Sequence, residues 1–298
     1  MPASSWRIAV LVLGLLALSL GAGQSFYVNS MQMRQRYMVE VVTDKLERVK
    51  RVRRPAILLG GGSNVLTGLR ASLLSDILHR PAYNLALITE GDDYRNALAM
   101  LEAGASAGDT VVYASRGFHA GPPILQDAIV KPAGGIDMRV ARTDGVIPHG
   151  SILRELVTYS TIFGEWSRPE NYNPSGDFTM CLGPKHILPE LPPVATPERD
   201  QYVRDLADFS TRMRKRNITV LLLAPDIYVR DDDVPRWVAL HEGFRSQLER
   251  AGVEWLRYPE SALFVTDESE FCGSNLHPAP RHAAMKTQWL AQQLASRH

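Results

Sequence analysis

The order of apolar and polar positions divides the chain into an N-terminal apolar run, a polar stretch and a long α/β region. Ile8 to Gly23 contains no charged residue, and the uncharged stretch continues through Val28. A membrane-spanning helix needs about 20 apolar residues, and the core of a signal peptide about 7–15. We therefore expect residues 1–28 to be an uncleaved membrane anchor. The small residues before Gln24 leave a cleaved signal peptide as the alternative.

Residues 29–54 are polar, and residues 45–54 hold six basic residues and one acid. Such a run near a membrane favours the cytoplasmic side, although it begins beyond the distance at which that rule is strong. A basic stretch of this kind can also contact anionic lipid head groups. We predict a solvated, partly helical basic stalk over 29–54.

Strands and helices alternate from Pro55 to the C-terminus. Apolar runs bounded by glycine or proline predict strands, and apolar residues three or four positions apart predict helices. The expected strands cover 56–59, 82–87, 110–114, 218–223 and 253–256, and the expected helices 64–79, 93–105, 199–216, 234–251 and 280–295. This rhythm predicts a three-layer α/β/α sandwich with a parallel, flavodoxin-like sheet of about five strands. One domain would span 55–298, with an irregular insertion at 117–198 that includes one helix, 152–163.

Composition and charge restrict the function. The chain is 45% hydrophobic and carries a formal charge of +1, which argues against disorder and against general nucleic-acid binding. Its two cysteines cannot form a Cys₄ metal site, and the acidic runs at 90–93 and 231–233 suit a turn and helix N-caps better than a cation site. We therefore expect neither a metal nor a cofactor.

The glycine-rich turn after the first strand reads GGGSNV over 60–65. It lacks the last glycine of a dinucleotide fingerprint, the lysine of a P-loop and the last glycine of a nucleophile elbow. A serine remains, Ser63, at the tip of a strand and the start of a helix. Free backbone N–H groups at such a point, here from Gly62 and Asn64, can hold a developing oxyanion. Ser63 is thus a candidate nucleophile, and a simple N-cap is the alternative.

A serine nucleophile needs a base, and His277 is the best placed of the eight histidines. It stands in the loop directly before the last helix, which in this topology opens at the same edge of the sheet as the Ser63 turn. His119, after the third strand, is a weaker candidate. His282, inside the closing helix, is expected at the surface.

The pairing of a strand–glycine–Ser63 turn with Leu-His-Pro before the last helix resembles the SGNH, or GDSL, hydrolase superfamily. More narrowly, the segments GGGSNVLTGL, RPAYNLAL and GDTVVYAS resemble membrane-anchored SGNH-like proteins of cell-envelope acyl transfer. Those proteins act in teichoic-acid D-alanylation and in O-acetylation of exopolysaccharides. The resemblance covers about residues 55–115 and 218–297, and its motifs are short.

Two blocks depart from the superfamily's pattern near the oxyanion site. Gly62 replaces the usual aspartate before the serine, and Ala86 replaces the usual oxyanion glycine after Asn84-Leu85. The backbone N–H of Ala86 is retained as an oxyanion candidate. Asn84 and Arg116, which follows the third strand, are candidates for substrate binding.

The last block departs as well, because Ser274 stands where an aspartate three residues before His277 is expected. An aspartate there would orient the imidazole and stabilise its cationic form. Ser274, Asp267 or Glu270 are the candidates for this orienting role. Without one of them, the site is a Ser–His dyad or the protein is an inactive scaffold.

The resemblance implies a serine acyltransferase that moves an acyl group, acetyl in the first instance, onto a cell-envelope or secreted polysaccharide. The donor would be a multi-pass membrane acyltransferase, and the domain would lie on the periplasmic side of the inner membrane on a single-pass anchor. A carbohydrate esterase or lipase and a non-catalytic scaffold remain the alternatives. In that oxidising compartment Cys181 and Cys272 could form a disulfide. Trp166, with nearby Tyr172 and Phe178, is expected either to line a sugar-binding cleft or to pack locally.

Overall fold

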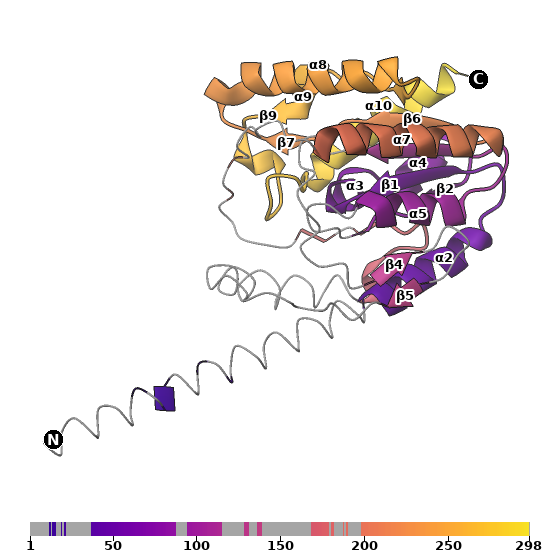
Figure 1. Ribbon diagram of the computed structural model, residues 1–298, viewed down its shortest axis with the longest axis horizontal. Helices are drawn as coiled ribbons and strands as arrows, with labels where there is room; N and C mark the ends of the chain where they lie inside the picture. The colour runs from indigo at the N-terminus through magenta and orange to yellow at the C-terminus, as the bar shows by residue number, and fades with distance from the viewer. Residues whose placement is uncertain are drawn as a thin grey trace, which may run out of the picture.

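The computed structural model describes residues 37–87, 94–114, 128–130, 136–138, 168–178, 180–181 and 198–297, with a few single positions elsewhere. At its centre lies a five-stranded parallel sheet (Figure 1). From one edge to the other, its strands are β2 (Ala82–Asn84), β1 (Ile57–Gly61), β3 (Thr110–Ala114), β6 (Thr219–Leu223) and β8 (Glu254–Trp255). This is the order of a flavodoxin-like sheet, and the prediction of a parallel sheet of five strands is confirmed.

Two neighbouring glycines of β1 show that helices cover both faces of the sheet. A Cβ at Gly60 would lie 2.4 Å from Leu101 of α5 (Tyr94–Gly104), and a Cβ at Gly61 would lie 2.5 Å from Val65 of α3 (Ser63–Gly68). Successive residues of a strand point to opposite faces, so α5 and α3 pack on opposite sides. The close approach of both helices explains why β1 ends in small residues.

Each face carries its own layer of helices. Helix α5 shares its layer with α2 (Thr43–Lys50), α7 (Glu198–Lys215) and α8 (Val234–Arg250), whereas α3 shares its layer with α4 (Ala71–Leu78) and α10 (Pro280–Ala295). The ring of Tyr94 in α5 meets that of Tyr202 in α7 edge-on, with centroids 4.4 Å apart. The strands between the layers are buried almost throughout, as expected of a parallel sheet covered on both sides.

Shorter elements complete the described chain. A π-helical turn, η1 (Tyr37–Val42), precedes α2, and the antiparallel pair β4 (Ala128–Val130) and β5 (Ile136–Met138) lies within the predicted insertion. After β6 the chain forms β7 (Ile227–Tyr228), which pairs in parallel with β9 (Phe264–Val265). One-turn helices are η2 (Pro169–Asn171), η3 (Asp231–Asp233), α9 (Glu260–Leu263) and η4 (Glu268–Glu270).

The single helix predicted over 64–79 is wrong, because the chain forms two helices there. Leu69 and Arg70 are extended between α3 and α4. The buried Asp177 carboxylate accepts hydrogen bonds from the amides of Ala71 (2.7 Å) and Ser72 (3.0 Å), so it caps α4 from a distant part of the chain. A capped helix start stabilises the break, and the apolar spacing continues across it.

The predicted stalk also needs correction, because its second half belongs to the domain. Val41, Val42, Leu46 and Val49 are buried in the same core as the sheet, and Lys45 is only 1% exposed. The apolar face of α2 supplies enough buried surface to hold the helix on the domain, and on its other face Asp44 and Glu47 pair with Arg48 and Lys50. The domain therefore begins near residue 41, ahead of Pro55.

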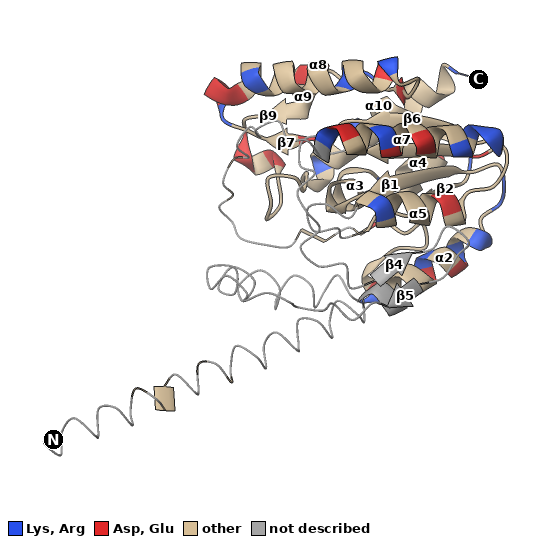
Figure 2. Cartoon of the chain, viewed as in Figure 1, with Lys and Arg blue, Asp and Glu red and all other residues tan. Residues whose placement is uncertain are grey.

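Among the described residues, no helix is long and apolar enough to cross a membrane. Residues 1–36 lie outside them except for five positions, as do most of 117–198 and the whole of the predicted helix 152–163. The anchor and the irregular insertion therefore stay predictions. Acidic and basic side chains alternate along α7 and α8, without a single-sign face (Figure 2), in keeping with the small net charge.

Candidate functional site

Ser63 stands at the carboxyl end of β1, at the first residue of α3. The turn before it depends on Gly61, whose φ of +146° is a conformation that side chains rarely adopt. Gly62 is extended and occupies the N-cap position, so Ser63 is inside the helix and is not its N-cap. The serine is half-buried.

The loop that carries His277 packs against the same short helix. A Cβ at Gly68, the last residue of α3, would lie 3.3 Å from the ring of Pro278. The loop is pinned by a bridge between Phe271 and Pro278 and by the amide of Cys272, which donates to the His277 carbonyl at 2.7 Å. Ser63 is thus at the first residue of α3, and Pro278 packs against its last residue, Gly68. The helix rises about 7.5 Å over the five residues from Ser63 to Gly68. The fold brings the two segments together across 214 positions of sequence.

The orienting candidates have other contacts. The carboxylate of Asp267 caps the one-turn helix η4, accepting from the amide of Ser269 at 2.9 Å and from its hydroxyl at 2.7 Å. The carboxylate of Glu270 lies 3.7 Å from the ring of His282. The hydroxyl of Ser274 accepts from the amide of Leu276 at 3.4 Å. Ser274 is therefore bound within the histidine's own loop.

The oxyanion candidates divide into two kinds. The amide of Ala86 donates to the side-chain oxygen of Asn84 at 3.0 Å, so it is already used. In the part of the chain that the structure describes, no acceptor is bonded to the amides of Gly62, Ser63 or Asn64. The side chain of Asn64 is only 5% exposed, and neither its oxygen nor its nitrogen has a hydrogen-bond partner there. The sequence indicates only the backbone of Asn64 as an oxyanion donor, because an asparagine after a candidate nucleophile carries no signal of burial.

Asn84 does not face a substrate cleft, and its expected binding role is corrected. Its side chain is fully buried, and its nitrogen donates to the carbonyls of Val65 (3.4 Å) and Leu69 (3.3 Å) and to Asp177 (3.3 Å). It therefore fastens the junction of α3 and α4 to the segment around Asp177. The role is to hold the Ser63 helix in place.

Lys45 seals the outer edge of the sheet. Its ammonium group donates to the carbonyls of Asn84 (2.8 Å), Ala86 (3.1 Å) and Gly176 (3.0 Å). The amide of Asn84 donates to the carbonyl of Ser175 at 2.8 Å on the same side. Strand β2 is an edge strand, and these contacts satisfy polar groups that no neighbouring strand can reach. Burial lowers the pKa of Lys45 to about 7, and the charge of Asp177 partly opposes this shift.

A second buried cluster lies beyond the carboxyl end of β6. Lys286 of α10 donates to Asp226 at 2.6 Å and to the carbonyl of Ala224 at 2.7 Å. His282, 5% exposed, lies 3.7 Å from both Asp226 and Glu270, so the expectation of a surface histidine is wrong. Asp226 raises the pKa of His282, whereas burial lowers that of Lys286. The cluster ties α10 to the strand next to the His277 loop, and charged residues scattered over 60 positions gave no sequence signal of it.

The cysteines and aromatic residues of the insertion are placed only in part. Cys181 and Cys272 form a disulfide, with Cα atoms 5.2 Å apart, which joins the insertion to the His277 loop. Tyr172 and Phe178 are buried against one another, with ring centroids 5.4 Å apart, so they pack locally and do not line a cleft. Arg116, Trp166 and His119 lie outside the described residues.

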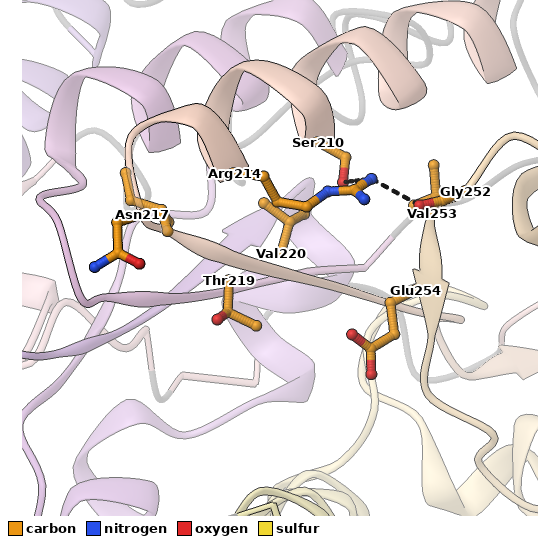
Figure 3. A pocket seen from close by; sticks show the side chains of 9 residues that line it. Ser210, Arg214, Asn217, Thr219, Val220, Gly252, Val253 and Glu254 are labelled. Atoms are coloured by element: carbon orange, nitrogen blue, oxygen red, sulfur yellow. Dashed lines mark hydrogen bonds between the residues drawn. The ribbon is translucent and has the colours of Figure 1, made fainter.

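A polar cavity of about 400 Å³ opens at the amino ends of strands β6 and β8 (Figure 3). It is lined by Arg214, Thr219 and Glu254, among others, at the starts of β6 and β8. Arg214 spans it, donating to the hydroxyl of Ser210 at 3.1 Å and to the carbonyl of Gly252 at 2.7 Å. Because Ser63 follows the carboxyl end of β1, this cavity is separate from the candidate site.

No protein-family model and no curated protein sequence matches the chain. Among solved structures, the comparison finds an acetyl xylan esterase, Est2A, from the rumen bacterium Butyrivibrio proteoclasticus. The two are 14% identical, with a TM-score of 0.39, and the match covers 83% of this chain and 64% of that one. The chain thus spans less than two thirds of the length of this neighbour.

Proposed function

We propose that this chain is an SGNH-type serine acyl-transfer enzyme that acts on a polysaccharide. The observation that supports it is the meeting of the Ser63 turn and the His277 loop on one short helix, α3. The chain order of nucleophile and base, with the base just before the last helix, is that of the superfamily the sequence resembles. The resemblance and the packing of Pro278 on Gly68 are independent observations, because the first comes from motifs and the second from the fold.

The proposed reaction has two steps. The Ser63 hydroxyl attacks the donor's acyl carbonyl while His277 takes its proton, and His277 then protonates the oxygen that leaves. In the second step a sugar hydroxyl attacks the acyl-serine, His277 takes the proton of that hydroxyl, and the proton returns to the Ser63 oxygen as the ester of the sugar is released. The amides of Gly62 and Asn64 and the buried Asn64 side chain are the donors available to the oxyanion. Water as the acceptor would give an esterase.

The proposed location is outside the cytoplasm, on an N-terminal membrane anchor. The Cys181–Cys272 disulfide supports an oxidising compartment, where such bonds persist. We propose that a multi-pass membrane acyltransferase supplies the acyl group. The acceptor would then be a polysaccharide of the cell envelope or one that is secreted.

The test compares wild type with Ser63→Ala, using Ser75→Ala as a matched control from the neighbouring helix α4. We expect Ser63→Ala to abolish labelling by a fluorophosphonate probe and to reduce acyl content of the polysaccharide, or hydrolysis of p-nitrophenyl acetate, by at least about a thousandfold. Ser75→Ala should behave as wild type. Labelling and activity that survive in Ser63→Ala would refute the catalytic proposal and favour the scaffold.

A further inference from the structure

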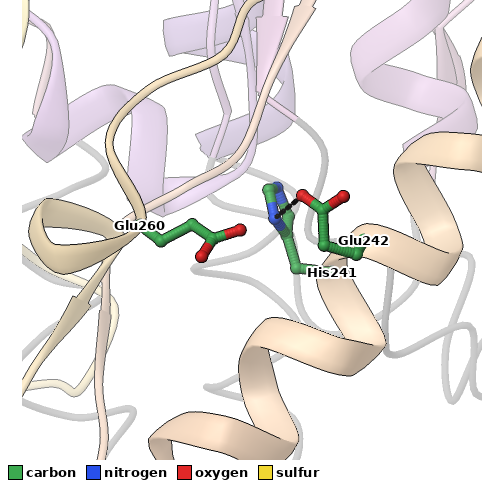
Figure 4. Close-up of side chains that lie close together, drawn as sticks. All are labelled: His241, Glu242 and Glu260. Atoms are coloured by element: carbon green, nitrogen blue, oxygen red, sulfur yellow. Dashed lines mark ion pairs between the residues drawn. The ribbon is translucent and has the colours of Figure 1, made fainter.

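A histidine and two glutamates converge where α8 meets α9, away from the Ser63 turn (Figure 4). His241 and Glu242 are neighbours in α8, and Glu260 is the first residue of α9. One nitrogen of the histidine and one carboxylate oxygen of each glutamate all lie within 4.8 Å of one another. The side chain of Glu260 reaches across the space between the two helices toward the other two residues.

His241 is buried without the partners that a buried imidazole requires. It is 3% exposed, and its ring is surrounded by those of Trp255 (5.5 Å between centroids) and Phe264 (5.9 Å). Neither ring nitrogen has a hydrogen-bond partner in the part of the chain that the structure describes. Its Nδ1 lies 4.0 Å from Oε1 of Glu242, which is beyond hydrogen-bond length. Buried polar atoms without a partner are rare, and each calls for a ligand or another explanation.

The charged groups around the histidine favour the binding of a cation. The Oε2 atom of Glu242 is bonded to Arg245, which leaves Oε1 directed at the imidazole. Glu249 lies near both Arg245 (4.0 Å) and Arg257 (3.3 Å). Glu249 and Arg257 form a pair of their own, so the two ligand carboxylates, Glu242 and Glu260, are opposed mainly by Arg245.

We propose that His241, Glu242 and Glu260 bind a divalent cation of the zinc class, which ties α8 to α9. A nitrogen donor with two carboxylates suits zinc and its neighbours in the first transition row, whereas calcium and magnesium prefer oxygen alone. Zinc binds nitrogen and oxygen at about 2.0–2.2 Å, so its ligand atoms lie about 3.3 Å apart in a tetrahedron. The present separations of up to 4.8 Å must shorten by up to about 1.5 Å, which side-chain rotations of the two glutamates would supply. A solvent molecule would complete the shell.

The position of the site gives the cation a structural role. Helix α9 runs directly into β9, which pairs with β7 and leads to the loop that carries His277. A cation at the start of α9 would fix this connection to α8, one of the longest helices. The proposal does not depend on the acyl-transfer function, because none of its three ligands belongs to the Ser63 site.

The test uses the full chain in detergent, stripped with a chelator, and titrates it with ZnCl₂ by calorimetry and with CoCl₂ by visible absorption. We expect one ion per chain and d–d absorption bands typical of a low-coordinate cobalt site. Glu260→Gln and Glu242→Gln should each weaken binding at least about tenfold. Glu249→Gln, an exposed glutamate about two turns along the same helix, is the matched control and should bind as wild type.

Two results would overturn the proposal. One is the absence of stoichiometric binding by a wild-type chain whose circular dichroism shows it folded. The other is binding that Glu260→Gln and Glu242→Gln leave unchanged, which would assign the ion to other histidines. Both variants replace glutamates that are only partly buried and leave the buried His241 ring in place, so we expect them to fold. The same circular dichroism spectra verify this.

Discussion

Replacing Lys45 with methionine tests whether one buried ammonium group holds the edge of the sheet. Methionine keeps the length and much of the volume of the side chain but donates no hydrogen bond. Three carbonyl oxygens, those of Asn84, Ala86 and Gly176, lose their donor inside the fold. Each buried acceptor left without a partner costs about 1–2 kcal/mol, so the variant should lose roughly 3–6 kcal/mol of stability. That is a large part of the 5–15 kcal/mol typical of a domain.

The free energy of unfolding is measured by urea titration, followed by tryptophan fluorescence and circular dichroism. Lys50→Met is the matched control, because Lys50 lies on the same helix with its side chain 60% exposed and pairs with Glu47 at the surface. Its loss should stay below about 1 kcal/mol. A Lys45→Met variant within about 1 kcal/mol of wild type would refute the idea that Lys45 seals β2.

The pH dependence of stability gives a second measure of the same group. Burial lowers the pKa of Lys45 to about 7, against about 10.4 in an unfolded chain. Between these values the unfolded state binds more protons than the folded state, so stability should rise as the pH increases from about 7 to about 10. Below pH 7 both states are protonated and this contribution is constant. The rise should be smaller in Lys45→Met than in Lys50→Met, and equal slopes would contradict the assignment.

Three further predictions rest on other contacts. Gly61→Ala should destabilise the fold by about 1–3 kcal/mol, because its Cβ would lie 2.9 Å from a backbone oxygen. The control Gly243→Ala has 3.7 Å of clearance in a helix and should be neutral or stabilise the fold by about 0.5–1 kcal/mol. Urea titration distinguishes the two variants. Replacing both cysteines with serine, which opens a loop of 91 residues, should lower the free energy of unfolding by roughly 2–4 kcal/mol, and a reductant should have no further effect on that variant. Lys286→Met should cost about 3–5 kcal/mol by leaving Asp226 charged and buried, and adding Asp226→Asn should recover part of it; a double variant no better than the single one would contradict the pairing.

The sequence predicted those parts of the fold that local patterns determine. The strand 110–114 and the helix 280–295 have the predicted bounds, because apolar runs and a proline at the helix start define them. The packing of the His277 loop near the Ser63 helix was also predictable, since the sheet topology places both loops at the carboxyl ends of the strands.

The remainder depends on contacts between distant residues. Nothing in the sequence near Lys45 indicates that its ammonium group will donate hydrogen bonds to carbonyls 39 to 131 positions away. The break between α3 and α4 depends on Asp177, which is more than a hundred residues beyond it. His282 is buried because Asp226 and Glu270 face it, and a lone histidine in a polar helix segment normally indicates a surface position.

The sealed edge of β2 also imposes an order on synthesis. Lys45 emerges 131 positions before Gly176, the last of its three acceptors, and Ser175 is equally late. A nascent chain that already contains β1, β2 and β3 therefore holds an unprotected sheet edge while the next sixty or so residues are still being made. Exposed strand edges of that kind are sites of misassembly between neighbouring chains. The period during synthesis in which β2 is exposed to misassembly therefore depends on how far along the sequence the 175–176 segment lies beyond β2.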